Sequence, residues 1–258
     1  MPQNRNSAFA VVLLHGIGGS ARMWTPQLAP FAAAGFEAVA VDLPGYGARP
    51  PVTAVDFEGL AADVEAQIAR RRLDRPAVVG HSMGGMVLQT MLRRRPDGYR
   101  AAVLACTSPA FGNADGDFQR KFVADRLAPL DAGKTMADLA PGLVDLMMGP
   151  APEAAGRVLA VEVMRAVPAD TYRAVVRCLV TFDGRANLAK ISVPTLCLAG
   201  EKDPNAPPGM VERMASKIPG SRFVCLPGVG HLPNLEAPAA FDAAILDFLR
   251  ETISRPAN

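Results

Sequence analysis

The sequence feature that most constrains the fold is a Gly-x-Ser-x-Gly pentapeptide, Gly80 to Gly84, set between an apolar run and a segment with helical periodicity. The apolar run predicts a buried strand, and the following segment predicts a helix. A sharp corner between a strand and a helix exposes the hydroxyl of its serine, and glycines let the two elements approach closely there. We therefore expect Ser82 to be a nucleophile; an ordinary glycine-rich loop is the alternative.

Short apolar runs alternate with helix-like segments over the first hundred residues and again after residue 192. This alternation predicts an α/β fold, with a mostly parallel central sheet flanked by helices on both faces. The expected strands are 9–15, 38–42, 76–80, 101–107, 193–200 and 222–227. The expected helices are 24–34, 56–72, 82–95, 209–218 and 241–252.

The alternation stops between residues 111 and 187, where helical patterns are interrupted by proline and glycine. We expect this stretch to be a helical cap, or lid, inserted into a core made of residues 1–110 and 188–258. The prolines expected to break its helices include Pro129 and Pro141.

A serine nucleophile needs a base, and the base needs an acid to orient it. His15 and His81 lie within glycine motifs, where local packing is the simpler explanation, so His231, in the loop after the last strand, is the expected base. Asp203 follows the strand before that one and is the expected acid; Glu201 is the runner-up. Parallel strands end at one edge of the sheet, where such side chains meet.

Acyl transfer also needs N–H donors for the oxyanion. The N–H of Met83 opens the helix after the nucleophile. We expect the second donor to be the N–H of Ile17, in the glycine-rich loop 15–20. These two backbone groups form the predicted oxyanion hole.

Five landmarks resemble those of the α/β-hydrolase fold superfamily, in the same order. They are His15-Gly16 with its following glycines, Asp42-Leu-Pro-Gly-Tyr-Gly47, Gly80-His-Ser-Met-Gly84, Gly200-Glu-Lys-Asp203 and Gly230-His231. The resemblance implies an eight-stranded, mostly parallel sheet with a helical cap after the sixth strand. Segments 15–24 and 203–207 are more narrowly similar to 3-oxoadipate enol-lactonases and related small carboxylesterases. The carboxylate of such a lactone needs a cationic partner, and the candidates in the cap are Lys134, Arg165, Arg173 and Arg177.

The chain departs from this family at its start. The family begins with a two-strand hairpin, yet only eight residues precede Phe9. We predict that the hairpin is missing or vestigial, which would leave residues 38–41 near an open sheet edge. An open apolar edge favours pairing with a second copy, so a homodimer is a hypothesis.

Composition argues against several partners. The net charge of +2 over 258 residues is small, and the arginine triplets 70–72 and 93–95 end predicted helices, so no nucleic-acid partner is expected. No apolar run is long enough to span a bilayer and no signal peptide is visible, so no membrane partner is expected. Cysteines without metal-ligand spacing indicate reduced thiols in a cytoplasmic protein and no metal site. These cysteines are Cys106, Cys178, Cys197 and Cys225. The predicted serine hydrolase is expected to need no cofactor.

The predicted function is hydrolysis of carboxylic esters or lactones of small, fairly apolar acids through an acyl-enzyme. We expect the substrate pocket to include Trp24, Phe111, Met148 and Leu232. A carbon–carbon bond hydrolase of the meta-cleavage type, which uses a similar triad, is the alternative within enzymes. The alternative from another class is a small-ligand receptor with weak residual hydrolysis.

Overall fold

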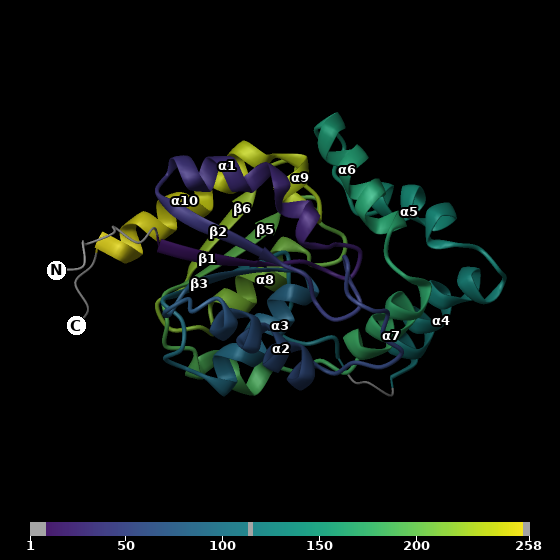
Figure 1. The fold of residues 1–258 in the computed structure, drawn as a ribbon, viewed down its shortest axis with the longest axis horizontal. Helices are drawn as coiled ribbons and strands as arrows, with labels where there is room; N and C mark the ends of the chain where they lie inside the picture. The colour runs from purple at the N-terminus through teal and green to yellow at the C-terminus, as the bar shows by residue number, and fades with distance from the viewer. Residues whose placement is uncertain (1–8, 113–115, 255–258) are drawn as a thin grey trace.

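A six-stranded parallel sheet forms the centre of the protein (Figure 1), which the computed structural model describes over residues 9–112 and 116–254. The spatial order is β2-β1-β3-β4-β5-β6, and every neighbouring pair is parallel. The strands are β1 (Phe9–Leu14), β2 (Phe36–Val41), β3 (Ala77–His81), β4 (Ala101–Ala105), β5 (Thr195–Gly200) and β6 (Arg222–Leu226). The predicted α/β fold class is confirmed.

The strand sequences explain the order of the sheet. The central strands β3, β4 and β5 are buried along their whole length, as continuous apolar runs covered on both faces must be. The outer strands β2 and β6 are only partly buried. Burial therefore decreases from the centre of the sheet to its edges.

Helices cover both faces (Figure 1). One face carries α1 (Thr25–Ala33) and α10 (Pro238–Ser254), with the short α9 (Pro233–Glu236) beside them. The other face carries α2 (Phe57–Arg70), α3 (Met83–Arg94) and α8 (Pro208–Ala215). Two short 3₁₀ helices also occur in the described residues: η1 (Ala21–Trp24) directly before α1, and η2 (Arg185–Lys190) shortly before β5.

In the described part of the chain that connects β4 to β5, four helices stand apart from the sheet (Figure 1). They are α4 (Asp117–Asp131), α5 (Met136–Asp145), α6 (Ala154–Arg165) and α7 (Ala169–Leu179). The chain enters and leaves this segment side by side, because Ala110 and Asp183 form an antiparallel bridge and the N–H of Phe111 donates to the carbonyl of Phe182 at 2.9 Å. We call residues 117–179 the cap; the predicted boundaries at 111 and 187 stay a prediction.

Two prolines in the cap do not break helices as predicted. Pro129 lies inside the last turn of α4, and Pro141 lies inside α5. Proline removes one N–H donor but its fixed φ is helical, so a helix with other support can continue through it. In α5 that support includes a capping box between Thr135 and Asp138.

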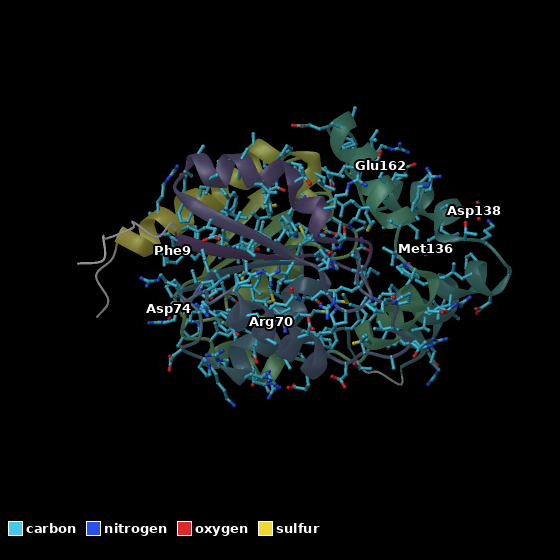
Figure 2. All side chains as sticks on the ribbon, in the orientation of Figure 1. Phe9, Arg70, Asp74, Met136, Asp138 and Glu162 are labelled. Atoms are coloured by element: carbon cyan, nitrogen blue, oxygen red, sulfur yellow. The ribbon has the colours of Figure 1, made fainter. Side chains whose placement is uncertain are left out.

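Figure 2 shows Met136 and Asp138, at the start of α5, at the end of the molecule opposite Phe9.

The predicted loss of the N-terminal hairpin concerns residues 1–8, which lie outside the described residues. Among the residues that are described, β2 is an edge strand, and it pairs on one side with β1. No helix in the described ranges combines the length and the apolar character that crossing a bilayer requires.

Candidate active site

Ser82 lies at the corner between β3 and α3 with a positive backbone angle, φ 53°. A Cβ at Gly80 would collide with the backbone of Gly84, and a Cβ at Gly84 would come within 2.5 Å of the Leu14 carbonyl oxygen. The N–H of Ser82 donates to the Ala105 carbonyl at 2.9 Å. The two glycines allow the close approach that the sequence predicted, and the neighbouring strand holds the strained residue in place.

The structure brings together Ser82, His231 and Asp203 from three different loops. His231 Nε2 lies 2.9 Å from Ser82 Oγ, and His231 Nδ1 lies 2.8 Å from Asp203 Oδ2. Each residue follows a parallel strand, β3, β5 or β6, and these strands end at the same edge of the sheet. Ser82 Oγ therefore faces a nitrogen that can accept its proton.

Asp203 is fully enclosed and fixed by backbone donors. Its Oδ1 accepts the N–H groups of Asn205 and Ala206 at 2.8 and 2.9 Å. Burial opposes ionisation, but His231 and these two N–H groups hold the pKa of Asp203 below its ordinary value. A carboxylate facing Nδ1 favours the His231 tautomer that carries its proton on Nδ1 and leaves Nε2 free.

The other two histidines have structural partners. His15 Nδ1 donates to the Gly16 carbonyl at 2.8 Å, and its Nε2 accepts the N–H of Leu43 at 3.1 Å. His81 Nε2 donates to the carbonyl of His231 at 2.6 Å. Burial lowers the pKa of His15 to about 4 and that of His81 to about 3. Both imidazoles are therefore neutral at pH 7, which agrees with local packing.

Glu201, the runner-up acid, does not contact His231. Its side chain accepts the N–H of Gly228 at 2.8 Å on the surface. The structure thus pairs His231 with Asp203 rather than with Glu201.

The glycine-rich loop after β1 lies directly against Ser82. A Cβ at Gly16 would come within 3.0 Å of the Ser82 Cβ. In the described part of the chain, neither the N–H of Ile17 nor that of Met83 donates to an acceptor. Met83 also opens helix α3, whose N-terminus favours negative charge. Both N–H groups named in the sequence analysis are therefore available to an oxyanion beside Ser82.

A buried carboxylate that the sequence analysis missed holds the loop of His231. Glu236 accepts the N–H groups of Gly230 and Leu232, on either side of His231, both at 2.8 Å. It also accepts the N–H of Gly149, in the link between α5 and α6, at 2.7 Å. Glu236 thus joins the cap to the loop that carries His231.

The backbone of His231 is bound from two further sides. Its N–H donates to the Met147 carbonyl in the cap at 2.7 Å, while its carbonyl accepts His81. A Cβ at Gly230 would come within 2.5 Å of the Gly149 N. The middle of the cap is therefore packed on this loop at backbone contact.

Two cavities meet at Ser82 and His231. The narrow one has about 30 Å³ of free space, and the wide one has about 430 Å³. Ile17 and Met147 line both. The narrow cavity is also lined by Met23, Val144, Ala160, Val163, Met164, Leu232 and Leu235. The wide cavity is also lined by Met86, Thr107, Phe111, Phe118, Phe122, Arg126, Leu179, Asn205 and Met210.

The four residues expected in the pocket have different positions. Leu232 lines the narrow cavity and Phe111 lines the wide one. Trp24 lies in the core against Phe241, with ring centroids 6.0 Å apart, and lines neither cavity. Met148 also lines neither, whereas its neighbour Met147 lines both.

Cys106, Asp203 and His231 place possible metal-ligand atoms within 4.8 Å of one another. Asp203 Oδ2 and His231 Nδ1, however, are hydrogen-bonded to each other. Burial raises the pKa of the Cys106 thiol well above its ordinary value, so the thiol keeps its proton. This donor set fits a carboxylate–imidazole pair beside a structural cysteine and does not fit a metal ion.

Comparison with known proteins gives consistent results. A profile described as the alpha/beta hydrolase family matches residues 11–244. The chain is similar to a pimeloyl-[acyl-carrier protein] methyl ester esterase of Neisseria meningitidis serogroup A / serotype 4A, with 31% identity over 96% of this chain and 79% of the relative.

Two solved structures share the fold. An esterase from Thermogutta terrifontis matches with a TM-score of 0.84 and 24% identity, covering 95% of this chain and 90% of its own. The enol-lactonase from Burkholderia xenovorans LB400 matches with a TM-score of 0.84 and 23% identity, covering 96% and 94%. At these identities the likeness is one of fold.

Proposed function

The chain belongs to the alpha/beta hydrolase family, and from this premise we propose that it is a serine esterase whose nucleophile is Ser82. The observation that carries the proposal is the series of hydrogen bonds from Ser82 Oγ to His231 Nε2, 2.9 Å, and from His231 Nδ1 to Asp203, 2.8 Å. This is the arrangement in which a serine hydroxyl loses its proton as it attacks a carbonyl.

The reaction follows from these positions. Ser82 Oγ attacks the ester carbonyl while His231 Nε2 takes its proton, and Asp203 stabilises the imidazolium. The N–H groups of Ile17 and Met83 bind the oxyanion. His231 then protonates the leaving alkoxide, and in the second half it activates the water that hydrolyses the acyl-enzyme.

The unequal cavities support a substrate with one small and one large part. The narrow cavity, about 30 Å³, admits a group near the size of a methyl, whereas the wide one, about 430 Å³, admits a chain. The relative from Neisseria is named a methyl ester esterase. We assign the alcohol of a small-alcohol ester to the narrow cavity and the acyl group to the wide one; lactones of matching size are also in the proposed class.

The test is a panel of methyl esters, longer alkyl esters, lactones and vinylogous diketones, assayed on the purified protein and on Ser82→Ala. We expect methyl esters to be hydrolysed, and Ser82→Ala to lose about 10⁶-fold in kcat while keeping its fold. Activity retained by homogeneous Ser82→Ala would overturn the proposal. Turnover of the diketone alone would support the carbon–carbon hydrolase, and binding without turnover would support the receptor.

Two further expectations remain proposals. All four cysteines are free, which supports a reducing compartment such as the cytoplasm. The edge position of β2 supports pairing of two copies, and a monomer mass by light scattering at working concentration would contradict it.

A further inference from the structure

We propose that Arg126, in the wall of the wide cavity, forms an anion-binding subsite, so that the preferred substrates are esters carrying a terminal carboxylate. The proposal rests on the proposed function for its ester bond and adds the chemistry of the other end. Half-esters of straight-chain dicarboxylic acids are the class that it predicts.

The cavity wall on α4 is a stripe set by helical spacing. Phe118, Phe122 and Arg126 are four residues apart, which puts them on one face of the helix. All three line the wide cavity, together with Phe111 and Ser82. With a rise of about 1.5 Å per residue, the stripe from Phe118 to Arg126 is about 12 Å long.

The aromatic rings support the guanidinium. The ring of Phe111 lies 4.8 Å from that of Phe122 and 6.1 Å from that of Phe118, centroid to centroid. The Arg126 Cζ lies over the Phe122 ring, 5.2 Å from its centroid. A stacked guanidinium keeps its hydrogen-bonding edge free.

Arg126 has no carboxylate partner in the described ranges 9–112 and 116–254. The three aspartates of its own helix all pair with other cations. These pairs are Asp117 with Arg120, Asp125 with Lys121, and Asp131 with Arg173. The acidic side chains nearest in sequence are therefore engaged, and the half-buried guanidinium is left for a ligand.

Charge on the cavity wall points to the same ligand. Arg126 is the only arginine, lysine, aspartate or glutamate among the described residues that line the wide cavity. The remainder of the wall is largely apolar or aromatic, which suits a hydrocarbon chain. A cation without a partner, beside a low-dielectric wall, attracts an anion more strongly than it would in water. A chain ending in a carboxylate satisfies both parts of the wall.

The experiment compares two methyl esters of equal chain length, one ending in a carboxylate and one ending in a methyl group. Hydrolysis of both is measured for the unaltered protein, Arg126→Gln, Arg126→Lys and Lys121→Gln. Lys121→Gln is the matched control, because it removes a cation from the same helix that is already paired with Asp125.

We expect Arg126→Gln to lower kcat/KM for the carboxylate ester by about 10- to 100-fold, mainly through KM, since it removes a charged hydrogen bond. Activity on the neutral ester should stay within about twofold, and Lys121→Gln should leave both unchanged. Arg126→Lys should recover part of the loss, because lysine keeps the charge but not the planar fork. Equal losses on both esters, or no loss on either, would overturn the subsite.

A binding measurement separates this proposal from the proposed function. Free straight-chain dicarboxylates are titrated calorimetrically into the unaltered protein and into Arg126→Gln, with about a tenfold weakening expected in the variant. If dicarboxylates bind in a way that depends on Arg126 but no ester is hydrolysed, the anion-binding subsite is supported and the esterase proposal is contradicted. If neutral esters are hydrolysed but Arg126→Gln binds dicarboxylates as well as the unaltered protein does, the esterase proposal is supported and the subsite is contradicted.

Discussion

The loops at the carboxyl ends of the strands and the helices of the cap meet across Ser82, and different interactions hold them. In the loops, Asp203 and Glu236 each accept two or more N–H groups within 2.9 Å. In the cap, the polar contacts are mainly ion pairs at the surface, such as Arg157 with Asp145, and surface pairs contribute little. Large exposed apolar side chains also gather there, namely Phe118, Leu146 and Val158.

This difference separates chemistry from selectivity. Buried carboxylates with several fixed donors allow one geometry, as proton transfer requires. Apolar helix packing tolerates substitution while volume is kept. We therefore expect changes in the loops to lower turnover for every substrate and changes in the cap to re-rank substrates.

The largest loss is expected from Asp203→Asn. An amide can still accept the N–H groups of Asn205 and Ala206, but it cannot stabilise the imidazolium of His231, so kcat should fall about 10⁴-fold. Steady-state kinetics on a methyl ester measures this, with Glu201→Gln as a control that should stay near the unaltered rate. A comparable loss in Glu201→Gln would assign the acid to the other carboxylate.

The next largest loss is expected from Glu236→Gln, which alters the contact between the cap and the loop of His231. Glu236→Gln replaces one of the two acceptor oxygens with an NH₂ group, which cannot accept the N–H groups that the carboxylate binds. The loop of His231 should therefore shift, and kcat should fall about 10- to 100-fold. KM should change little. The rate is expressed per active site titrated with an organophosphonate, so that unfolded protein does not count.

The control for this variant is again Glu201→Gln, which removes a carboxylate from the N–H of Gly228 in the same loop. Hydrogen exchange of Gly149, Gly230 and Leu232 should accelerate in Glu236→Gln alone. If Glu236→Gln has fewer active sites that react with the organophosphonate but an unchanged rate per reactive site, Glu236 contributes only to stability.

A smaller effect is expected from the cap. Met164 lines the narrow cavity and lies against Gly18 of the glycine-rich loop after β1. Met164→Ala should enlarge that cavity and reduce the preference for methyl over butyl esters about tenfold. Met148→Ala, outside both cavities, is the matched control. A uniform loss on all esters would contradict the expectation that changes in the cap alter substrate preference rather than turnover.

The smallest effect lies in the core, away from both regions. Asp242 of α10 is buried, its Oδ1 has no partner in the described residues, and burial raises its pKa to about 6. A raised carboxyl pKa costs stability as pH rises from about 4, its unfolded value, to about 6. Asp242→Asn should raise the melting temperature at pH 7 by about 2–4 °C. The gain should vanish near pH 4, and activity at pH 7 should not change.

The sequence predicted the loops far better than the cap. Ser82, Asp203 and His231 could be placed because parallel strands end at one edge and the order of the motifs says which strand each follows. Glu236 was missed because a carboxylate five residues after His231 gives no signal until the short helix α9 turns it back under the loop.

The cavity walls show what was missing. Met23 and Met147 line cavities where the sequence analysis chose Trp24 and Met148, the next residue along in each case. The sequence does not determine how each of these segments is rotated about its own axis, and that rotation decides which side chain faces a cavity. Rotation of a short turn depends on what packs against it, here Phe241 behind Trp24. Arg126 was missed for a similar reason, since its lack of a carboxylate partner among the described residues becomes clear only when the ion pairs of α4 are known. None of the cap cations considered from the sequence, Lys134, Arg165, Arg173 and Arg177, lines the wide cavity.

The positive φ of Ser82 carries an evolutionary consequence. A serine in that conformation costs roughly 1–3 kcal/mol, which a glycine would avoid. Selection for stability alone would therefore remove the hydroxyl, and its proposed role as the nucleophile is what opposes that loss. A lineage released from the demand for that role would gain stability from glycine at position 82, so such descendants would be expected to keep the fold while losing the proposed esterase activity.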